Sequence, residues 1–161
     1  MKKSIHLLML LFFSAIVITS CKKDDNGNEP FVNGSATING TAFINLDLTN
    51  DTLGVIYENV PSGTAIYAKI NSKDLVEFPS NGVNYGDLYY TTQIGANGEF
   101  SFTIPANTKN VTVSFSSDDF KANQIQADTT SEQKIFYLPA GFTETVHNGV
   151  TKLTEVFFSE K

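Results

Sequence analysis

From residue 36 onward, apolar and polar positions alternate along the chain with a period of two. The first segment places Ala36, Ile38, Ala42 and Ile44 on one side. Three further segments repeat this alternation, at 64–70, 100–104 and 111–115. Successive side chains of a β-strand point to opposite faces, so the pattern predicts strands with one face on a core and one in water.

Weaker versions of the same pattern predict more strands, at 54–60, 88–94, 133–138, 144–147 and 153–158. The clearest turn is Ala96-Asn97-Gly98, because Asn-Gly tolerates a positive φ. It predicts a hairpin between 91–94 and 99–104, and Pro105 is expected to close the second strand. Roughly eight strands at this spacing predict an all-β domain, either a β-sandwich or a small barrel.

The first twenty residues have a different pattern. Lys2 and Lys3 precede an almost wholly apolar run of 12 residues, 7–18. This run is too short for a membrane-spanning helix, which needs about 20 residues. It fits the hydrophobic region of a secretory signal, about 7–15 residues long behind a basic start. We therefore expect residues 1–20 to be a signal peptide.

The segment Ile18-Thr19-Ser20-Cys21 resembles the bacterial lipobox and follows the apolar run directly. In lipoproteins the Cys thiol receives a diacylglycerol, the chain is cut before it, and the new amino group is usually acylated. The resemblance implies that Cys21, the one cysteine of the chain, attaches the protein to a membrane through lipid. Two or more acyl chains give a stable anchor. The alternative is a buried structural cysteine.

Residues 21–30 contain no apolar side chain suited to a core, so we expect a solvated tether before a domain at 31–161. The Asp and Asn residues of this segment do not have the spacing of a calcium-binding loop. The short acidic run after Cys21 resembles the export signal of Bacteroidota surface lipoproteins. That resemblance implies placement on the outer face of the outer membrane.

The order of the strands resembles carboxypeptidase-regulatory-like and prealbumin-like (transthyretin-like) domains. The matching segments are 37–41, 60–68 and 90–105, the last containing Asn97-Gly98-Glu99-Phe100-Ser101-Phe102. The resemblance covers residues 35–120 and implies a single Ig-like or prealbumin-like antiparallel β-sandwich, used as an accessory module. It transfers no catalytic residue. Residues after 120 depart from the family pattern by extra strands.

Composition narrows the classes of partner. The chain has 11 Lys, no Arg and 17 acidic residues, for a net charge of −6. Without Lys2 and Lys3 the balance is 9 against 17, or −8. An acidic chain without Arg is a poor nucleic-acid binder, so we expect no nucleic-acid partner. One cysteine excludes an intramolecular disulfide and a Cys-rich zinc site, and no P-loop motif is present.

We expect no catalytic site and no cofactor. His147 is the one histidine after the signal segment, and no G-x-S-x-G motif accompanies it. Glu144 lies three residues before His147, which on a strand puts the two on opposite faces. The alternative is a small surface hydrolase acting on a glycan or a peptide. It would need converging carboxylates or a cleft centred on His147.

Two groups of residues are candidates for ligand binding. Tyr85, Tyr89 and Tyr90 could form an aromatic platform for a glycan or protein ligand, although the absence of Trp weakens a carbohydrate-binding interpretation. Alternatively, one Tyr packs inward, because Tyr89 and Tyr90 must point to opposite faces. Asp118 and Asp119 are a weak candidate calcium site. We favour a turn with solvated charges there.

Asp51-Thr52-Leu53 and Asp128-Thr129-Thr130 resemble the O-glycosylation motif of exported Bacteroidota proteins, which makes Thr52 and Thr129 candidate acceptors. Together these features predict a lipid-anchored, non-catalytic β-sandwich at the cell surface that serves as a binding, adhesion or accessory module. Besides the hydrolase, the other alternative is a periplasm-facing accessory of outer-membrane uptake or assembly machinery.

Overall fold

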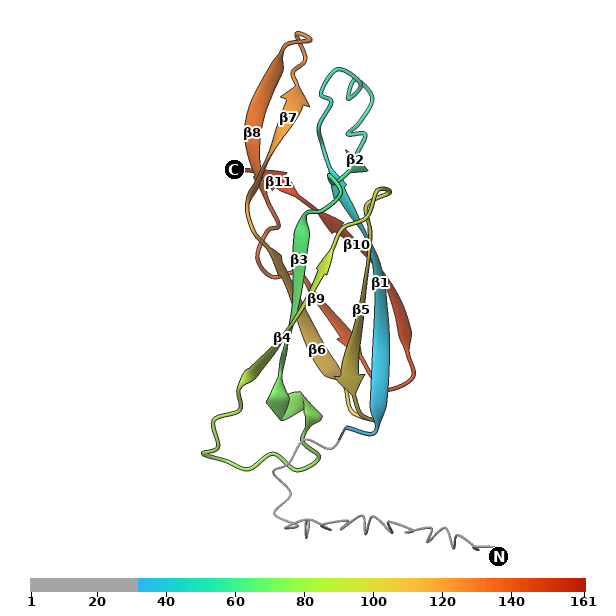
Figure 1. Ribbon diagram of the computed structural model, residues 1–161, viewed down its shortest axis with the longest axis vertical. Helices are drawn as coiled ribbons and strands as arrows, with labels where there is room; N and C mark the ends of the chain where they lie inside the picture. The colour runs from blue at the N-terminus through green and yellow to red at the C-terminus, as the bar shows by residue number, and fades with distance from the viewer. Residues whose placement is uncertain (1–31) are drawn as a thin grey trace, which may run out of the picture.

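The computed structural model describes residues 32–161, which form an all-β fold (Figure 1). This confirms the predicted fold class, although these residues form eleven strands where the spacing suggested roughly eight. The strands are β1 (Gly34–Ile44), β2 (Glu58–Asn59), β3 (Ala65–Asn71), β4 (Asp87–Gln93), β5 (Glu99–Ala106), β6 (Val111–Ser117), β7 (Phe120–Ile125), β8 (Ser131–Tyr137), β9 (Thr143–Val146), β10 (Thr151–Phe157) and β11 (Ser159–Glu160). A short 3-10 helix, η1 (Ser72–Leu75), follows β3.

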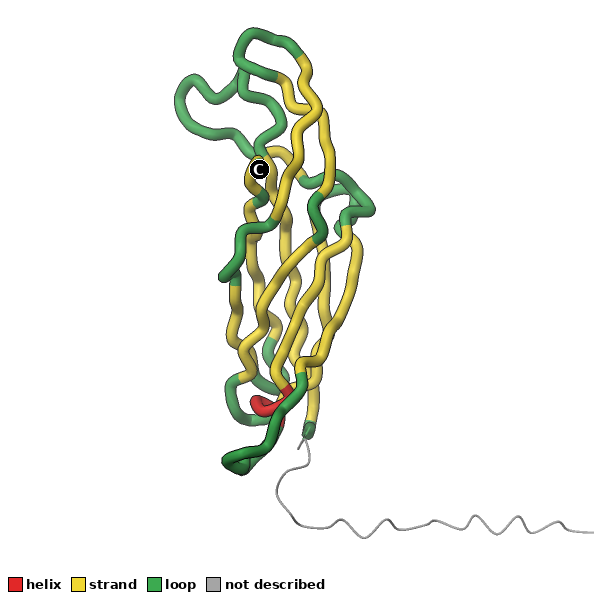
Figure 2. The backbone as a smooth tube through the Cα atoms, turned by 90° about the vertical axis from the view of Figure 1, so that its left-hand side faces the viewer, coloured by secondary structure: helices red, strands yellow, loops and turns green. Residues whose placement is uncertain are grey.

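Two larger sheets make the sandwich. One has the order β4-β3-β6-β9 and is antiparallel throughout. In the other sheet, β1 pairs with β10 along one edge. Along its other edge β1 pairs first with β5, through residues 34–41, and then with β2, through residues 43–44. A third sheet, β11-β8-β7, extends beyond them at the end where β1 finishes (Figures 1 and 2). Backbone bonds join β7 to the chain after β1, including Ile125 N to Leu46 O at 2.7 Å.

The core forms where the apolar faces of the sheets meet, as the alternation predicts. Ile38 of β1, Ile104 of β5 and Ile66 of β3 are completely buried, and the residues between them along each strand are more accessible. Each strand thus contributes every second side chain to the core. All four strongly alternating segments of the sequence are confirmed as strands.

The turn at Asn97-Gly98 is confirmed, but the predicted hairpin is not. Gly98 has φ +75°, and an added Cβ would lie 2.8 Å from the carbonyl oxygen of Ala42. The strands on either side of the turn belong to different sheets, because β4 pairs with β3 while β5 pairs with β1. Turn chemistry specifies a reversal of the chain and leaves open which sheet the next strand enters.

The strand predicted over 54–60 is wrong except for β2 at Glu58–Asn59. The residues before β2 belong to a loop that the side chain of Asp51 organises. Its carboxylate accepts from the backbone N–H of Ile56 at 2.8 Å and from the side-chain amide of Asn45 at 2.7 Å. Hydrogen bonds to the Asp51 carboxylate therefore take the place of the backbone hydrogen bonds that a strand would make to a neighbouring strand.

Strand β7 was missed because Gln124, its most buried position, is polar, although Phe120 and Ala122 on the same face pack against the core. Gln124 is 3% exposed and donates through Nε2 to the carbonyl oxygen of Asn45 at 2.9 Å. A buried amide with a backbone partner fits a strand interior, but it breaks the apolar alternation that marks a strand in sequence.

The pairing of β1 with β10 is parallel, from Thr37 opposite Thr151 to Phe43 opposite Phe157. It differs from the wholly antiparallel sandwich that the family resemblance implies. The extra strands expected after residue 120 are confirmed. Pro105 does not close its strand, because β5 continues to Ala106. It is tolerated since β5 pairs on one side only, with β1.

The predicted signal peptide, the lipidation site Cys21 and the tether 21–30 lie outside the described residues. Within residues 32–161, no helix has the length and apolar character needed to cross a bilayer.

Candidate functional site

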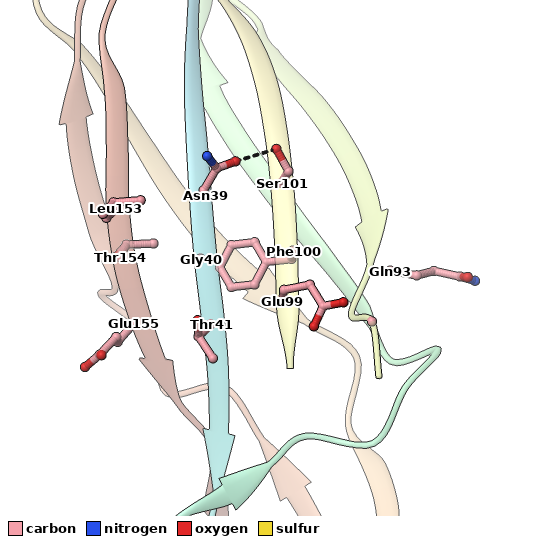
Figure 3. A pocket seen from close by; sticks show the side chains of 11 residues that line it. Asn39, Gly40, Thr41, Gln93, Glu99, Phe100, Ser101, Leu153, Thr154 and Glu155 are labelled. Carbon is pink, nitrogen blue, oxygen red and sulfur yellow. Dashed lines mark hydrogen bonds between the residues drawn. The ribbon is translucent and has the colours of Figure 1, made fainter. Parts of the chain in front are cut away.

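An open groove of about 670 Å³ lies on the outer face of the sheet formed by β10, β1 and β5 (Figure 3). The register places outward side chains in two rows across the three strands. One row is Leu153, Asn39 and Ser101, and the next is Glu155, Thr41 and Glu99. In the first row, the Ser101 hydroxyl donates to Oδ1 of Asn39 at 2.8 Å, and this bond fixes the orientation of the Asn39 amide (Figure 3).

Because Gly40 has no side chain, a core residue can pack against β1 directly beneath this groove. The ring of Phe100 lies against Gly40, where an added Cβ would come within 2.0 Å of Cζ. Phe100 is 4% exposed, and its ring packs edge-on against Phe102 and Phe115 in the core. The absence of a side chain at residue 40 therefore lets a large aromatic ring fill the interior opposite β1.

The charged side chains among the lining residues are Glu99 and Glu155, and they lie on opposite rims of the groove. Figure 3 shows their carboxylates pointing away from one another. The side chain of Glu99 folds back toward the turn at Asn97-Gly98, where Oε2 accepts from the backbone N–H of Asn97 at 2.8 Å. Gly95 leaves room for this, since an added Cβ would lie 2.5 Å from Oε1. The groove is thus acidic at its rims, which favours a neutral or cationic ligand.

Beyond the groove, the same outer face carries three aromatic rings, Phe43, Tyr57 and Phe157, which we call the aromatic cluster. Phe43 and Phe157 are register partners and stack with centroids 5.5 Å apart. Tyr57 packs edge-on against Phe157 at 5.0 Å. Tyr57 and Phe157 remain 44% and 42% exposed. Preorganised, accessible rings of this kind supply contact area at low entropic cost.

A recess of about 280 Å³ adjoins the aromatic cluster at Tyr57. Its wall includes Asn45, whose Oδ1 is the one buried side-chain polar atom within residues 32–161 that has no hydrogen-bond partner. A buried acceptor without a donor is costly, and Asn45 bears this cost while its amide nitrogen donates to Asp51. The other walls come mostly from Leu48, Val55, Gln124, Phe136 and Phe158.

The three predicted tyrosines do not form one platform. Tyr89 is 68% exposed on the outer face of β4, whereas its neighbour Tyr90 packs against the core. Burial raises the pKa of the Tyr90 hydroxyl. The hydroxyl of Tyr85 accepts from the backbone N–H of Ser80 at 2.8 Å, a bond within the loop that precedes β4. The predicted opposite orientation of Tyr89 and Tyr90 is confirmed.

The outward partner of Tyr89 is Lys69 of β3, and Tyr67 is on the same face two residues earlier. The hydroxyl of Tyr67 donates to Oδ2 of Asp118 at 2.6 Å. This bond, desolvation and the negative charge of Asp118 together raise the pKa of Tyr67. The Tyr67 side chain is therefore held by a hydrogen bond to Asp118, in the segment between β6 and β7.

Asp118 and Asp119 are engaged with different partners. Asp118 accepts from Tyr67, and Asp119 forms an ion pair with Nζ of Lys161 at 2.5 Å. Within the described part of the chain, no three His, Cys, Asp or Glu residues gather closely enough to hold a metal ion.

His147 is exposed at the turn after β9. Glu144, three residues earlier, is engaged elsewhere, by the hydroxyl of Thr154 at 2.7 Å and the ammonium of Lys152 at 3.3 Å. The structure therefore does not bring Glu144 and His147 together as a catalytic pair.

The candidate glycosylation sites Thr52 and Thr129 are both exposed. Thr52 lies in the loop between β1 and β2, and Thr129 lies at the tip of the β7–β8 hairpin. Figure 1 shows both segments at the end of the molecule opposite the start of β1. Thr129 has φ +72°, a left-handed conformation that β-branched residues rarely adopt.

The aromatic cluster was missed at the level of sequence, although part of its signal is present. Because Ala42 and Ile44 face the core, the residue between them, Phe43, must face outward. The contact of Phe43 with Phe157, more than a hundred residues later, requires the parallel pairing of β1 with β10. Searches against known protein families and curated proteins found no match for this chain.

Proposed function

We propose that this protein is a lipid-anchored, non-catalytic binding or accessory module on the outer face of the outer membrane. Cys21 carries the lipid, and the sandwich is a prealbumin-like domain akin to the carboxypeptidase-regulatory-like family. The observation that carries the proposal is the outer face of β10, β1 and β5, where an open groove continues into the aromatic cluster.

The direction of β1 supports presentation of this face away from the membrane. Strand β1 begins two residues after Val32, the first described residue, and Phe43 follows nine residues after Gly34. At about 3.3 Å per residue, this strand separates the aromatic cluster from the anchored end by roughly 30 Å. The tether 21–30 adds at most about 35 Å of reach. The cluster is thus the part of the face that a ligand outside the cell meets first.

The lining chemistry suits an extended glycan or protein ligand. Asn39, Thr41 and Ser101 offer hydroxyl and amide groups along β1 and β5, and the acidic rims repel anions. Accessible rings of Tyr57 and Phe157 offer stacking surfaces for a sugar or for an apolar or cationic side chain.

The arrangement of carboxylates supports binding over hydrolysis. A glycosidase needs two carboxylates facing each other across the scissile bond. The carboxylates of Glu99 and Glu155 point away from each other (Figure 3), and that of Glu99 accepts a hydrogen bond from the backbone N–H of Asn97.

The anchor is tested by expressing wild type and Cys21→Ala in a bacterial host that processes lipoproteins. We expect fatty-acid labelling and membrane fractionation for the wild type only. Labelling of the variant would contradict lipidation at Cys21. Protease treatment of intact cells then distinguishes the surface from the periplasmic face, because a periplasmic domain is protected.

The binding face is tested by placing a photo-crosslinking amino acid at Leu153, which is 75% exposed beside the groove. The matched control is Ser116, exposed on the opposite sheet. We expect adducts from residue 153 alone on intact cells, with their mass reporting a glycan or a protein. Equal adducts from both positions, or none from either, would contradict a ligand on this face.

A further inference from the structure

The end of the sandwich where β1 begins carries exposed apolar side chains with lysines among them. The loop 76–86, between η1 and β4, lies at this end in both views (Figures 1 and 2). Phe78 on this loop is 70% exposed, and Val83 is 43% exposed. Val32, at the start of the described chain, is 46% exposed. An exposed Phe ring on a polar loop marks an interaction surface when other apolar residues accompany it.

Lysine side chains accompany these apolar residues. Nζ of Lys109, from the loop between β5 and β6, lies 5.5 Å from the centroid of the Phe78 ring. The same ammonium donates to the carbonyl oxygen of Glu77. Lys73 is exposed on η1. A ring beside a long cationic side chain, as Phe78 lies beside Lys109, matches the interface of a bilayer, where the ring enters the apolar boundary and the ammonium group stays at the headgroups.

Residues 72–87, which run from η1 to the start of β4, contain three carboxylates, and two of them form hydrogen bonds or an ion pair. Asp74 accepts from the backbone N–H of Thr112 at 3.0 Å. Asp87 faces Lys69 at 3.4 Å and accepts from the amide of Asn71 at 2.9 Å. The third, Glu77, is exposed. Among the described residues neither Lys73 nor Lys109 forms an ion pair with a carboxylate, so both ammonium groups can meet anionic headgroups.

We infer that this end of the domain rests on the lipid bilayer, with Phe78 inserted at the interface and Lys109 beside it at the headgroups. The inference rests on the proposed anchor at Cys21. Cys21 is eleven residues from Val32, a segment that spans at most about 40 Å. A lipid in the membrane thus holds this end within reach of the surface at a high effective concentration. Contact here would orient the sandwich upright, with the aromatic cluster in the half of the molecule away from the membrane (Figure 1).

The chain contains no Trp, so single-tryptophan variants report position without background. We would compare Phe78→Trp with Leu53→Trp, whose residue is fully exposed in the loop at the opposite end. Both lipidated full-length variants are reconstituted into vesicles of phosphatidylethanolamine and phosphatidylglycerol, with and without a brominated phospholipid. Flotation on a density gradient measures anchoring, and quenching by the brominated lipid measures insertion.

We expect both variants to float, with loss of emission and a shift to shorter wavelength for Phe78→Trp only. Adding Lys109→Glu to Phe78→Trp should weaken the quenching. If both variants float and neither is quenched, or both are quenched equally, the inference is wrong while the anchor stands. If neither variant floats, the anchor itself is wrong and the inference fails with it.

Discussion

The hydroxyl of Thr154 on β10 donates to the carboxylate of Glu144 on β9 at 2.7 Å, which joins the two large sheets at one edge of the sandwich. The other oxygen of the same carboxylate faces Lys152 at 3.3 Å. The side chain of Glu144 is 19% exposed, so water competes weakly for these bonds. One carboxylate thus connects β9 and β10, which are consecutive in the chain and belong to different sheets.

Glu144→Ala is therefore expected to lower the free energy of unfolding by about 1–2 kcal/mol, because it removes one charge-assisted hydrogen bond and one partly screened ion pair. Urea denaturation measures the change. Glu155→Ala, on the exposed face of β10, is the matched control and should stay within about 0.5 kcal/mol of wild type. Equal effects of the two substitutions would show that the Glu144 connection contributes nothing specific.

Gly40→Ala is expected to destabilise the protein by about 1–3 kcal/mol, because the new Cβ would lie 2.0 Å from Cζ of Phe100 and force the ring to move. Gly86→Ala is the control, since no atom lies within 4 Å of a Cβ placed there. Thermal unfolding of both variants makes the comparison. A fully stable Gly40→Ala variant would mean that Phe100 does not pack against β1 as described.

The carboxylate of Asp128 should titrate below its ordinary range. The hydroxyl of Thr130 donates to Oδ1 at 2.5 Å and its backbone N–H at 3.0 Å, and both bonds lower the pKa. A pKa below the unfolded value of about 3.9 means that the stabilisation is present above that pH and is lost as the pH falls through the folded pKa. NMR titration of the carboxyl carbon measures it.

Thr130→Val removes the hydroxyl donor and should raise the pKa of Asp128 toward the ordinary value. Thr112→Val, whose hydroxyl is not a donor to Asp128, should leave that pKa unchanged. An unchanged titration in Thr130→Val would show that the hydroxyl bond does not form in solution.

Thr52 and Thr129 are expected to carry O-linked glycans when the protein is made in a host with the corresponding export machinery. Both residues are exposed in turns at the same end of the molecule, where a transferase has access. Intact-mass measurement should show added mass that falls by one glycan in Thr52→Ala and by one in Thr129→Ala. Thr108→Ala, at another exposed threonine, should leave the mass of the glycans unchanged. An unmodified wild-type mass would refute the expectation.

Sequence reasoning predicted the inward faces of the strands better than the functional face. The alternation around Ile38, Ile66 and Val113 identifies core residues directly, because a period of two is a local property of an extended chain. The structure does not gather the candidate tyrosines Tyr85, Tyr89 and Tyr90 on one surface, because adjacent residues of a strand point to opposite faces and Tyr90 packs against the core. The aromatic cluster needs long-range pairing, which one-dimensional patterning does not encode.

The sequence by itself determined that this chain is all-β, which side of each strong strand faces the core, and where the chain turns at Asn97-Gly98. These follow from local sterics and from the burial of apolar side chains. Only the tertiary structure decided that this turn joins two sheets and that β10 lies parallel to β1. Strand partners are chosen by the packing of the whole core, and that choice brings Phe43 to Phe157 and Glu144 to Thr154.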